Sequence, residues 1–183
     1  MAYSTQLYSL ISSLPPLSMQ EKPAVSREEF LESAAAFMLD REAEMLAALS
    51  IVPTDDAVFP EGSFCEQYTR WERALRRSIL RIRTARRTDA AEQLAKHADA
   101  FECDADSAAI RAYAAADPLE RERLLDAARW TKTEELTSGH VFDLDQVCAY
   151  FIRLQIAEKW AKRTAGDAEK NLAAAAAALL GGI

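Results

Sequence analysis

Glycine is scarce in this sequence, with five residues among 183. A β-sandwich or barrel needs turn residues every ~8–12 positions, so this shortage argues against both architectures. The sequence also lacks the GxxxxGK[ST] and GxGxxG patterns, which removes the usual phosphate-binding loops. Alanine, in contrast, fills about a fifth of the chain and is among the strongest helix formers. The composition therefore predicts an all-α protein.

Cysteine and histidine are also too few and too dispersed to indicate a site. The three cysteines, Cys65, Cys103 and Cys148, form no CxxC pair, so we expect reduced and mostly buried thiols, with neither a disulfide framework nor a zinc site. His97 and His140 lie far apart in the chain, and there is no HExxH or GxSxG pattern. We therefore expect no catalytic residues, no metal and no cofactor.

Long hydrophobic runs are missing as well. No stretch approaches the ~18–20 apolar residues of a membrane helix, and the most apolar run, residues 172–183, is mostly alanine. The first basic residue is Lys22, so the chain starts without the charged region of a signal peptide. These features predict no direct membrane span and a cytoplasmic protein, with peripheral attachment to the inner face of the cell membrane left open. The net charge of −7 argues against general nucleic-acid binding.

Helix signals divide the chain into about six or seven packed helices, which we interpret as a single domain over residues 1–183. Ser26 and Glu29 form a capping box at one helix start, and a break is expected near Asp40. Asp117 followed by proline marks another start, and Asp143 marks the last long helix. The predicted regions are an N-terminal segment and proline-containing loop at 1–25, undecided between strand and helix at its start; an arginine-rich helix at 63–87; a helical hairpin at 117–165; and an alanine-rich tail at 167–183.

Three of these helices carry apolar residues at helical spacing, which predicts the face that each one buries. The last long helix has the widest apolar surface, so we expect it to be covered on two sides. The predicted packing residues are, in chain order, Trp71, Leu75, Ile79 and Ile82; Leu124, Leu125, Ala128 and Trp130; and Leu144, Val147, Cys148, Phe151, Ile152, Leu154 and Trp160.

The arginine-rich helix is the one feature of the sequence that suggests a function. Between Glu66 and Arg87 there are eight arginines and two glutamates, a local charge of +6 that leaves −13 for the rest of the chain. One interpretation is a solvated face that pairs with acidic neighbours in the same fold, such as those in residues 28–44. The other is a docking surface for an acidic partner, because a guanidinium is weakly hydrated and forks onto carboxylates. A third interpretation is that the helix binds anionic lipid or nucleic acid. The candidate partner-binding residues are Arg73, Arg76, Arg77, Arg81 and Arg83.

Four sequence blocks, spread over residues 3–160, together resemble an uncharacterised bacterial family whose members are encoded among V-type ATPase subunits. The blocks are Tyr8 to Pro15 followed by Lys22-Pro23 and Ser26 to Leu31; Trp71 with the arginines up to Arg87; Asp117 to Asp126 with Arg129-Trp130; and Phe142 to Asp145 through Tyr150, ending in Glu158-Lys159-Trp160. Residues 88–116 and the alanine-rich tail carry no such block.

This family looks like a shortened, distant counterpart of the C-type (or d-type) subunits of V-type ATPases. The resemblance implies an all-helical, non-catalytic subunit on the cytoplasmic side that couples the central rotor shaft to the membrane ring. Its partners would be other subunits of that ATPase, and no ligand residues are carried over. The alternative is a stand-alone helical adaptor or assembly factor for a membrane complex, because the C-type subunits contain more helical lobes than 183 residues supply.

Overall fold

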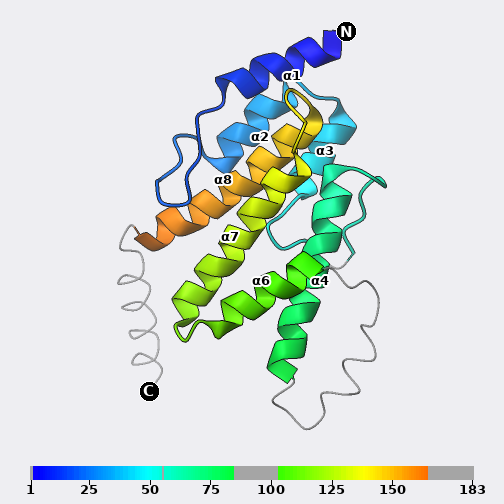
Figure 1. The fold of residues 1–183 in the computed structure, drawn as a ribbon. Coiled ribbons are helices and arrows are strands. Elements are labelled where there is room, and N and C mark those ends of the chain that lie inside the picture. Colours follow the sequence, from blue (N-terminus) through cyan, green and yellow to red (C-terminus); the bar gives the residue numbers. More distant parts are fainter. Residues whose placement is uncertain (1, 55, 85–102, 165–183) are drawn as a thin grey trace, which may run out of the picture.

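The computed structural model describes residues 2–54, 56–84 and 103–164, and every regular element in these ranges is an α-helix (Figure 1). The prediction of an all-α protein is thus confirmed. The predicted helix end at 85–87 and the alanine-rich tail at 167–183 lie outside the described residues. The helices are α1 (Ala2–Ser13), α2 (Arg27–Ala35), α3 (Asp40–Ala48), α4 (Phe64–Thr84), α6 (Cys103–Ala114), α7 (Pro118–Leu136) and α8 (Leu144–Thr164).

The predicted helix starts are present with their caps. Ser26 Oγ accepts a hydrogen bond from the Glu29 amide at 3.2 Å, and Glu29 Oε2 accepts one from the Ser26 amide at 2.8 Å. The Asp117 carboxylate caps α7 ahead of a proline at the first helical position, and Asp143 Oδ1 accepts from a backbone amide in the first turn of α8. The expected break near Asp40 separates α2 from α3, and the undecided N-terminal segment is the helix α1.

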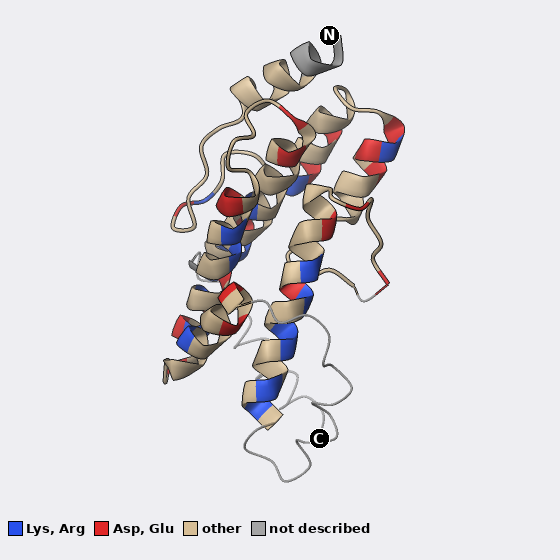
Figure 2. Cartoon of the chain, turned by 45° about the vertical axis from the view of Figure 1, so that its right-hand side comes forward, with Lys and Arg blue, Asp and Glu red and all other residues tan. Residues whose placement is uncertain are grey.

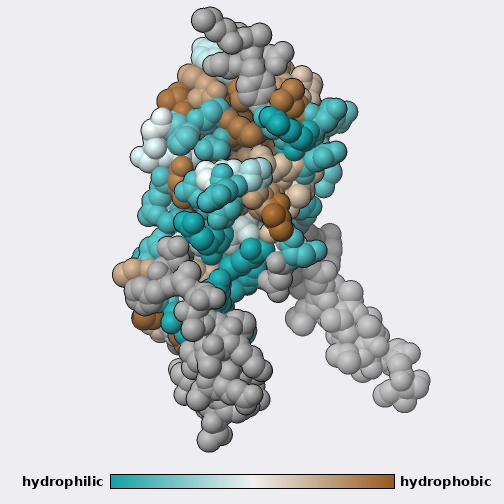
Figure 3. Space-filling view, turned by 90° about the vertical axis from the view of Figure 1, so that its right-hand side faces the viewer, coloured by the Kyte–Doolittle hydropathy of each residue, from teal (hydrophilic) through white to brown (hydrophobic). Residues whose placement is uncertain are grey.

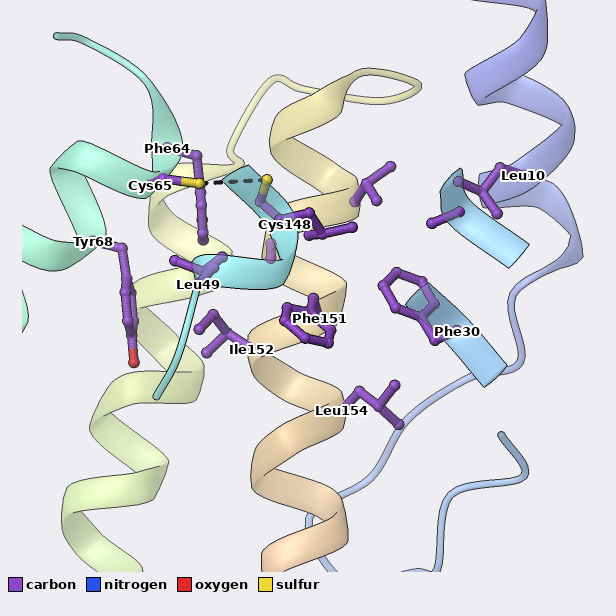
Figure 4. Packing of buried hydrophobic residues seen from close by; sticks show 14 of the residues in the cluster. Leu10, Phe30, Leu49, Phe64, Cys65, Tyr68, Cys148, Phe151, Ile152 and Leu154 are labelled. Carbon is purple, nitrogen blue, oxygen red and sulfur yellow. Dashed lines mark hydrogen bonds between the residues drawn. The ribbon is translucent and has the colours of Figure 1, made fainter. Parts of the chain in front are cut away.

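Helix α8 runs through the middle of the fold, with α2 and α7 alongside it and α1 across one end (Figure 1). Most of its apolar residues are fully buried, on more than one side as the sequence predicts, while Leu144 and Trp160 are partly buried. Phe151 stacks on Phe30 of α2 with ring centroids 5.6 Å apart. On another side, the Sγ atoms of Cys148 and Cys65 of α4 lie 3.6 Å apart (Figure 4). The packing of α8 therefore ties α2 to α4.

The cysteines only partly follow the expectation of buried thiols. Cys65 and Cys148 are free thiols within the main hydrophobic cluster, whereas Cys103 is a free, exposed thiol at the start of α6. Cys103 precedes two acidic residues in the first turn, and the buried positions of that helix are taken by alanines instead.

A second, smaller hydrophobic cluster joins α4 to α6 and α7. Trp71 and Leu75 of α4 are buried in it, and Ile79 and Ile82 pack at its edge, which confirms the predicted apolar stripe. The opposing buried residues of α6 are alanines, including Ala105 and Ala109. Small side chains let two helices approach closely, so α6 lies tightly across the middle of α4 (Figure 1).

Helix α7 packs through its predicted apolar residues, but it also buries charged and polar ones. The predicted packing residues Leu124, Leu125, Ala128 and Trp130 are partly buried. Leu125 and Ala128 pack against the second cluster, and Trp130 packs against the main one. The fully buried residues of this helix are polar: Asp126, Arg129 and Thr133. The sequence analysis missed these three residues because a buried polar residue needs partners on other helices, and those partners are far away in the sequence.

Arg129 is the centre of a buried ion-pair network that joins α4 to α7. Its Nε and Nη2 donate to the two carboxylate oxygens of Glu72 at 3.0 and 2.8 Å, and its Nη1 donates to Asp126 Oδ1 at 2.8 Å. Both carboxylates are fully buried. Burial raises the pKa of Glu72 against the opposing effect of Arg129. The arginine itself stays charged, because a guanidinium is effectively always protonated in proteins.

The network continues from Asp126 to α8 and ends at the surface. Asp126 Oδ2 accepts hydrogen bonds from Lys159 Nζ at 2.7 Å and from Trp160 Nε1 at 2.9 Å. Lys159 also pairs with Glu122 at 2.7 Å, and Arg163 pairs with the same carboxylate at 3.0 Å. Charge-assisted hydrogen bonds thus connect three helices and fix how they are rotated against one another.

Removing Arg129 alone should be far more damaging than removing its ion pair. We expect Arg129→Met to lower the free energy of unfolding by about 3–5 kcal/mol, because Glu72 is left buried without its counter-charge. The double variant Glu72→Leu, Arg129→Met should recover at least about half of that loss, since a hydrophobic pair carries no desolvation penalty. Urea unfolding followed by circular dichroism measures both values. A single variant as stable as the wild type would contradict the assignment.

Glu122 should make the fold sensitive to acid. Partial burial opposes ionisation, but hydrogen bonds from Arg163 and Lys159 outweigh it and lower the pKa of Glu122 from 4.5 to about 2. The unfolded chain therefore binds a proton first as the pH falls. The stability that Glu122 contributes is complete above pH 4.5 and is lost between that value and pH 2.

The variant Glu122→Gln should accordingly show a flatter dependence of unfolding free energy on pH between 4.5 and 2 than the wild type. Urea unfolding at a series of pH values measures this slope. Glu44→Gln, at an exposed position of α3, is the matched control and should keep the wild-type slope. Equal slopes for the wild type and Glu122→Gln would exclude this ion pair as a source of acid sensitivity.

Candidate functional site

The arginines of α4 form a basic strip along the helix surface that faces away from α8 (Figure 2). Arg81 and Arg83 are exposed, while Arg73, Arg76 and Arg77 are half-buried. The opposite side of α4 faces the interior of the protein, where Trp71 and Glu72 are buried. Burial of one face of the helix therefore leaves the guanidinium groups on the other.

Two of the candidate arginines bind backbone within the same chain. Arg73 Nη2 donates to the carbonyl oxygens of Ala57 at 2.8 Å and Thr54 at 3.3 Å. Arg76 Nη2 donates to the carbonyl of Pro53 at 2.9 Å. All three acceptors belong to the α3–α4 loop, residues 49–63. This loop is not helical, so its carbonyls do not accept the regular hydrogen bonds of a helix. Arg73 and Arg76 therefore hold this loop against α4.

The same loop has two further anchors at its beginning. The Tyr68 hydroxyl of α4 donates to the Ile51 carbonyl at 2.9 Å. Gln155 of α8 donates to the Leu49 carbonyl at 3.2 Å and accepts from the Ile51 amide at 3.3 Å. Burial is the main reason that the pKa of Tyr68 is raised well above its usual range, so the hydroxyl stays protonated and remains a donor. The loop is fixed from both α4 and α8.

Arg81 is placed differently from Arg73 and Arg76. Its Nη2 pairs with the Asp106 carboxylate of α6 and lies 3.1 Å from the hydroxyl of Ser78, which also donates to Asp106. If the arginines pair within the fold, the sequence analysis expects their acidic partners in residues 28–44, for example. The carboxylate that pairs with Arg81 comes from α6 instead. Two of the candidate arginines therefore hold the loop, whereas the two at the end of the helix are exposed. The partner-binding role of the set stays a prediction.

His140 belongs to no metal cluster among the described residues. His140 Nδ1 is 2.5 Å from Asp143 Oδ2, and this hydrogen bond raises the pKa of the exposed imidazole. His97 lies outside the described residues. Among residues 2–54, 56–84 and 103–164, no three metal-binding side chains gather. Within the same ranges, no helix is both long and apolar enough to cross a bilayer.

The residues that the sequence analysis missed are the buried charges Glu72, Asp126 and Arg129. One signal was available for Glu72, because it lies four residues after Tyr68 and three before Leu75, on a buried side of α4. Asp126 and Arg129 have the spacing of an ordinary exposed i,i+3 ion pair, so the local pattern carries no sign of burial.

The side of the molecule that carries α3 and α4 is mainly hydrophilic, with small separate hydrophobic patches among its described residues (Figure 3). Small, scattered patches of this kind are ordinary on a protein surface and do not by themselves mark a binding site.

Residues 79–172, just over half of the chain, match a family described as "Protein of unknown function (DUF2764)". The chain belongs to the DUF2764 family. No curated protein and no solved structure matches it. The matched region contains all of α6, α7 and α8, together with the last six residues of α4. It includes the Asp117 and Phe142 blocks on which the resemblance rests, but begins after the N-terminal block. The expectation of an uncharacterised family is confirmed, and the link to V-type ATPases is taken up below as a proposal.

Loss of the two loop-binding arginines should release the α3–α4 loop of this DUF2764 member. In Arg73→Ala, Arg76→Ala, we expect the loop amides to exchange with solvent roughly tenfold faster, because hydrogen bonds from a charged donor are lost. Hydrogen exchange with mass spectrometry over residues 50–58 measures this rate. Arg70→Ala, on the exposed surface of the same helix, is the control and should exchange at the wild-type rate. An unchanged rate in the double variant would show that other contacts hold the loop.

Proposed function

We propose that this DUF2764 protein is a non-catalytic component of a bacterial V-type ATPase, similar to the C-type subunits, that couples the central rotor shaft to the membrane ring. The observation that carries the proposal is the exposed basic end of α4, at Arg81 and Arg83, on a helix braced by a buried ion-pair network. The sequence blocks that resemble a family encoded with V-type ATPase subunits supply the biological setting.

A coupling subunit must keep its shape while a partner exerts force on it. Three features of α4 fit this requirement. Glu72 attaches it to α7 through two hydrogen bonds from Arg129, Cys65 and Tyr68 pack it into the main cluster, and Trp71 and Leu75 pack it against α6. A load applied to the basic strip would thus pass into the body of the fold.

The charge distribution also supports docking onto an acidic partner. A segment of charge +6 within a chain of net charge −7 orients the protein in the field of a complementary subunit. The partners proposed are the rotor shaft and the membrane ring. The position proposed is the cytoplasmic side, peripheral to the inner face of the membrane.

The second candidate is a stand-alone helical adaptor or assembly factor. The same basic strip supports it, because transient docking needs charge complementarity as much as a permanent contact does. The two candidates differ in stoichiometry, since a structural subunit stays in the complex and an assembly factor leaves it.

Co-purification from native membranes distinguishes these candidates. We expect a tagged chain, recovered after gentle solubilisation, to bring down V-type ATPase subunits in a fixed ratio, and raised salt to weaken the association because exposed charges contribute to it. Recovery well below a fixed ratio would favour an assembly factor. Recovery of the folded, soluble chain without any ATPase subunit would contradict both the membership in the complex and the coupling role.

A further inference from the structure

A pocket of about 230 Å³ lies where the end of α1 and the loop that follows it meet α7 and α8. Ile11 of α1 and the loop residues 14–17, two of them prolines, supply an apolar wall. Trp130 of α7 and Tyr150 of α8 supply aromatic rings. The Tyr150 hydroxyl donates to the Pro15 carbonyl at 3.0 Å, which attaches the loop to α8. Three segments that are far apart in the sequence therefore enclose one apolar and aromatic pocket.

Of the described residues that line this pocket, Arg153 of α8 alone is charged. Its guanidinium is partly buried. Nε donates to the Thr133 hydroxyl at 2.7 Å, and Nη2 lies 3.5 Å from the Thr137 hydroxyl. Both acceptors are neutral, and Arg153 forms no ion pair with another described residue. Burial lowers the pKa of Arg153, because the positive charge has lost water without gaining a full counter-charge.

The acidic residue Glu134 compensates this charge only in part. It opposes the effect of burial on the pKa of Arg153. However, Glu134 is exposed, does not line the pocket, and already accepts a hydrogen bond from Trp130 Nε1 at 3.0 Å. Lys132, which lines another cleft, is different, because it pairs with two carboxylates of that same cleft. The pocket at Arg153 therefore offers a positive charge that an anionic ligand can neutralise.

We propose that this pocket binds a small aromatic monocarboxylate. The carboxylate accepts hydrogen bonds from the guanidinium of Arg153, whose Nη1 has no hydrogen-bond partner among the described residues. The ring of the ligand packs against Trp130 and the prolines of the loop. This binding site goes beyond the proposed function and does not depend on it.

The size and charge of the pocket favour this class of ligand. A cavity of about 150 Å³ holds a benzene molecule, so about 230 Å³ admits a ring with a short chain that ends in a carboxylate. A partner helix, about 10 Å across, is too wide. A phosphate monoester carries close to two negative charges, whereas the described lining offers a single cation. A sugar would place many hydroxyl groups against apolar and aromatic surface, where they lack partners.

Isothermal titration calorimetry with the full chain tests which charge the pocket recognises. We expect 3-phenylpropionate to bind, and 3-phenylpropanamide, which keeps the shape without the charge, to bind about tenfold more weakly or less. Arg153→Met should weaken the binding of 3-phenylpropionate by a similar factor. The matched control is Arg41→Met, which removes an exposed arginine of α3 outside the pocket and should leave the affinity unchanged.

Two outcomes of the titration would overturn the proposal: no binding of 3-phenylpropionate at millimolar concentrations, or equal affinities for the acid and the amide. The comparison of the two compounds uses the wild-type chain. It therefore decides the question even if Arg153→Met does not fold.

Tryptophan fluorescence tests where the ligand binds. Because Trp130 lines the pocket, bound 3-phenylpropionate should change its emission, and Trp130→Phe should abolish that change. Trp71→Phe is the matched control and should retain it. Trp71 lies in the second cluster, and its Nε1 forms no hydrogen bond with the described residues, so phenylalanine loses none. A change that survives in Trp130→Phe would place the ligand elsewhere and refute the site.

Discussion

The buried guanidinium of Arg129 is the constraint on which the arrangement of the helices depends. It can be removed from water only if its donors and charge are satisfied, and Glu72 and Asp126 satisfy them from α4 and α7. Asp126 in turn needs Lys159 and Trp160 of α8. Because these bonds have narrow geometries, they fix the rotation of α4 about its own axis, and with it the direction in which the arginine strip points.

This arrangement gives the arginines of one helix different roles. Arg73 and Arg76 in the middle of α4 donate to carbonyls of the α3–α4 loop, whereas Arg81 near its end pairs with Asp106 of α6. A rigid helix with its inner arginines engaged and its outer ones exposed is suited to a directional contact. That property, rather than any catalytic chemistry, is what the proposed coupling role uses.

Much of the fold could be predicted from local sequence. The capping box at Ser26, the cap at Asp117, the Trp71 stripe and the two-sided burial of α8 all depend on interactions within a few residues, which sequence spacing records. The burial of charged residues on α7 could not be predicted. Asp126 and Arg129 have the spacing of an exposed ion pair, and their burial depends on Glu72, which lies 57 residues from Arg129.

The sequence by itself determined that the protein is helical, where several helices begin, and that one of them concentrates positive charge. Helix periodicity and caps are short-range, so the residues that produce them are neighbours in the chain. Only the tertiary structure decided which charges are buried, which arginines hold the loop and which one pairs with α6. Those outcomes depend on pairs brought together by packing, and no local spacing encodes such pairs.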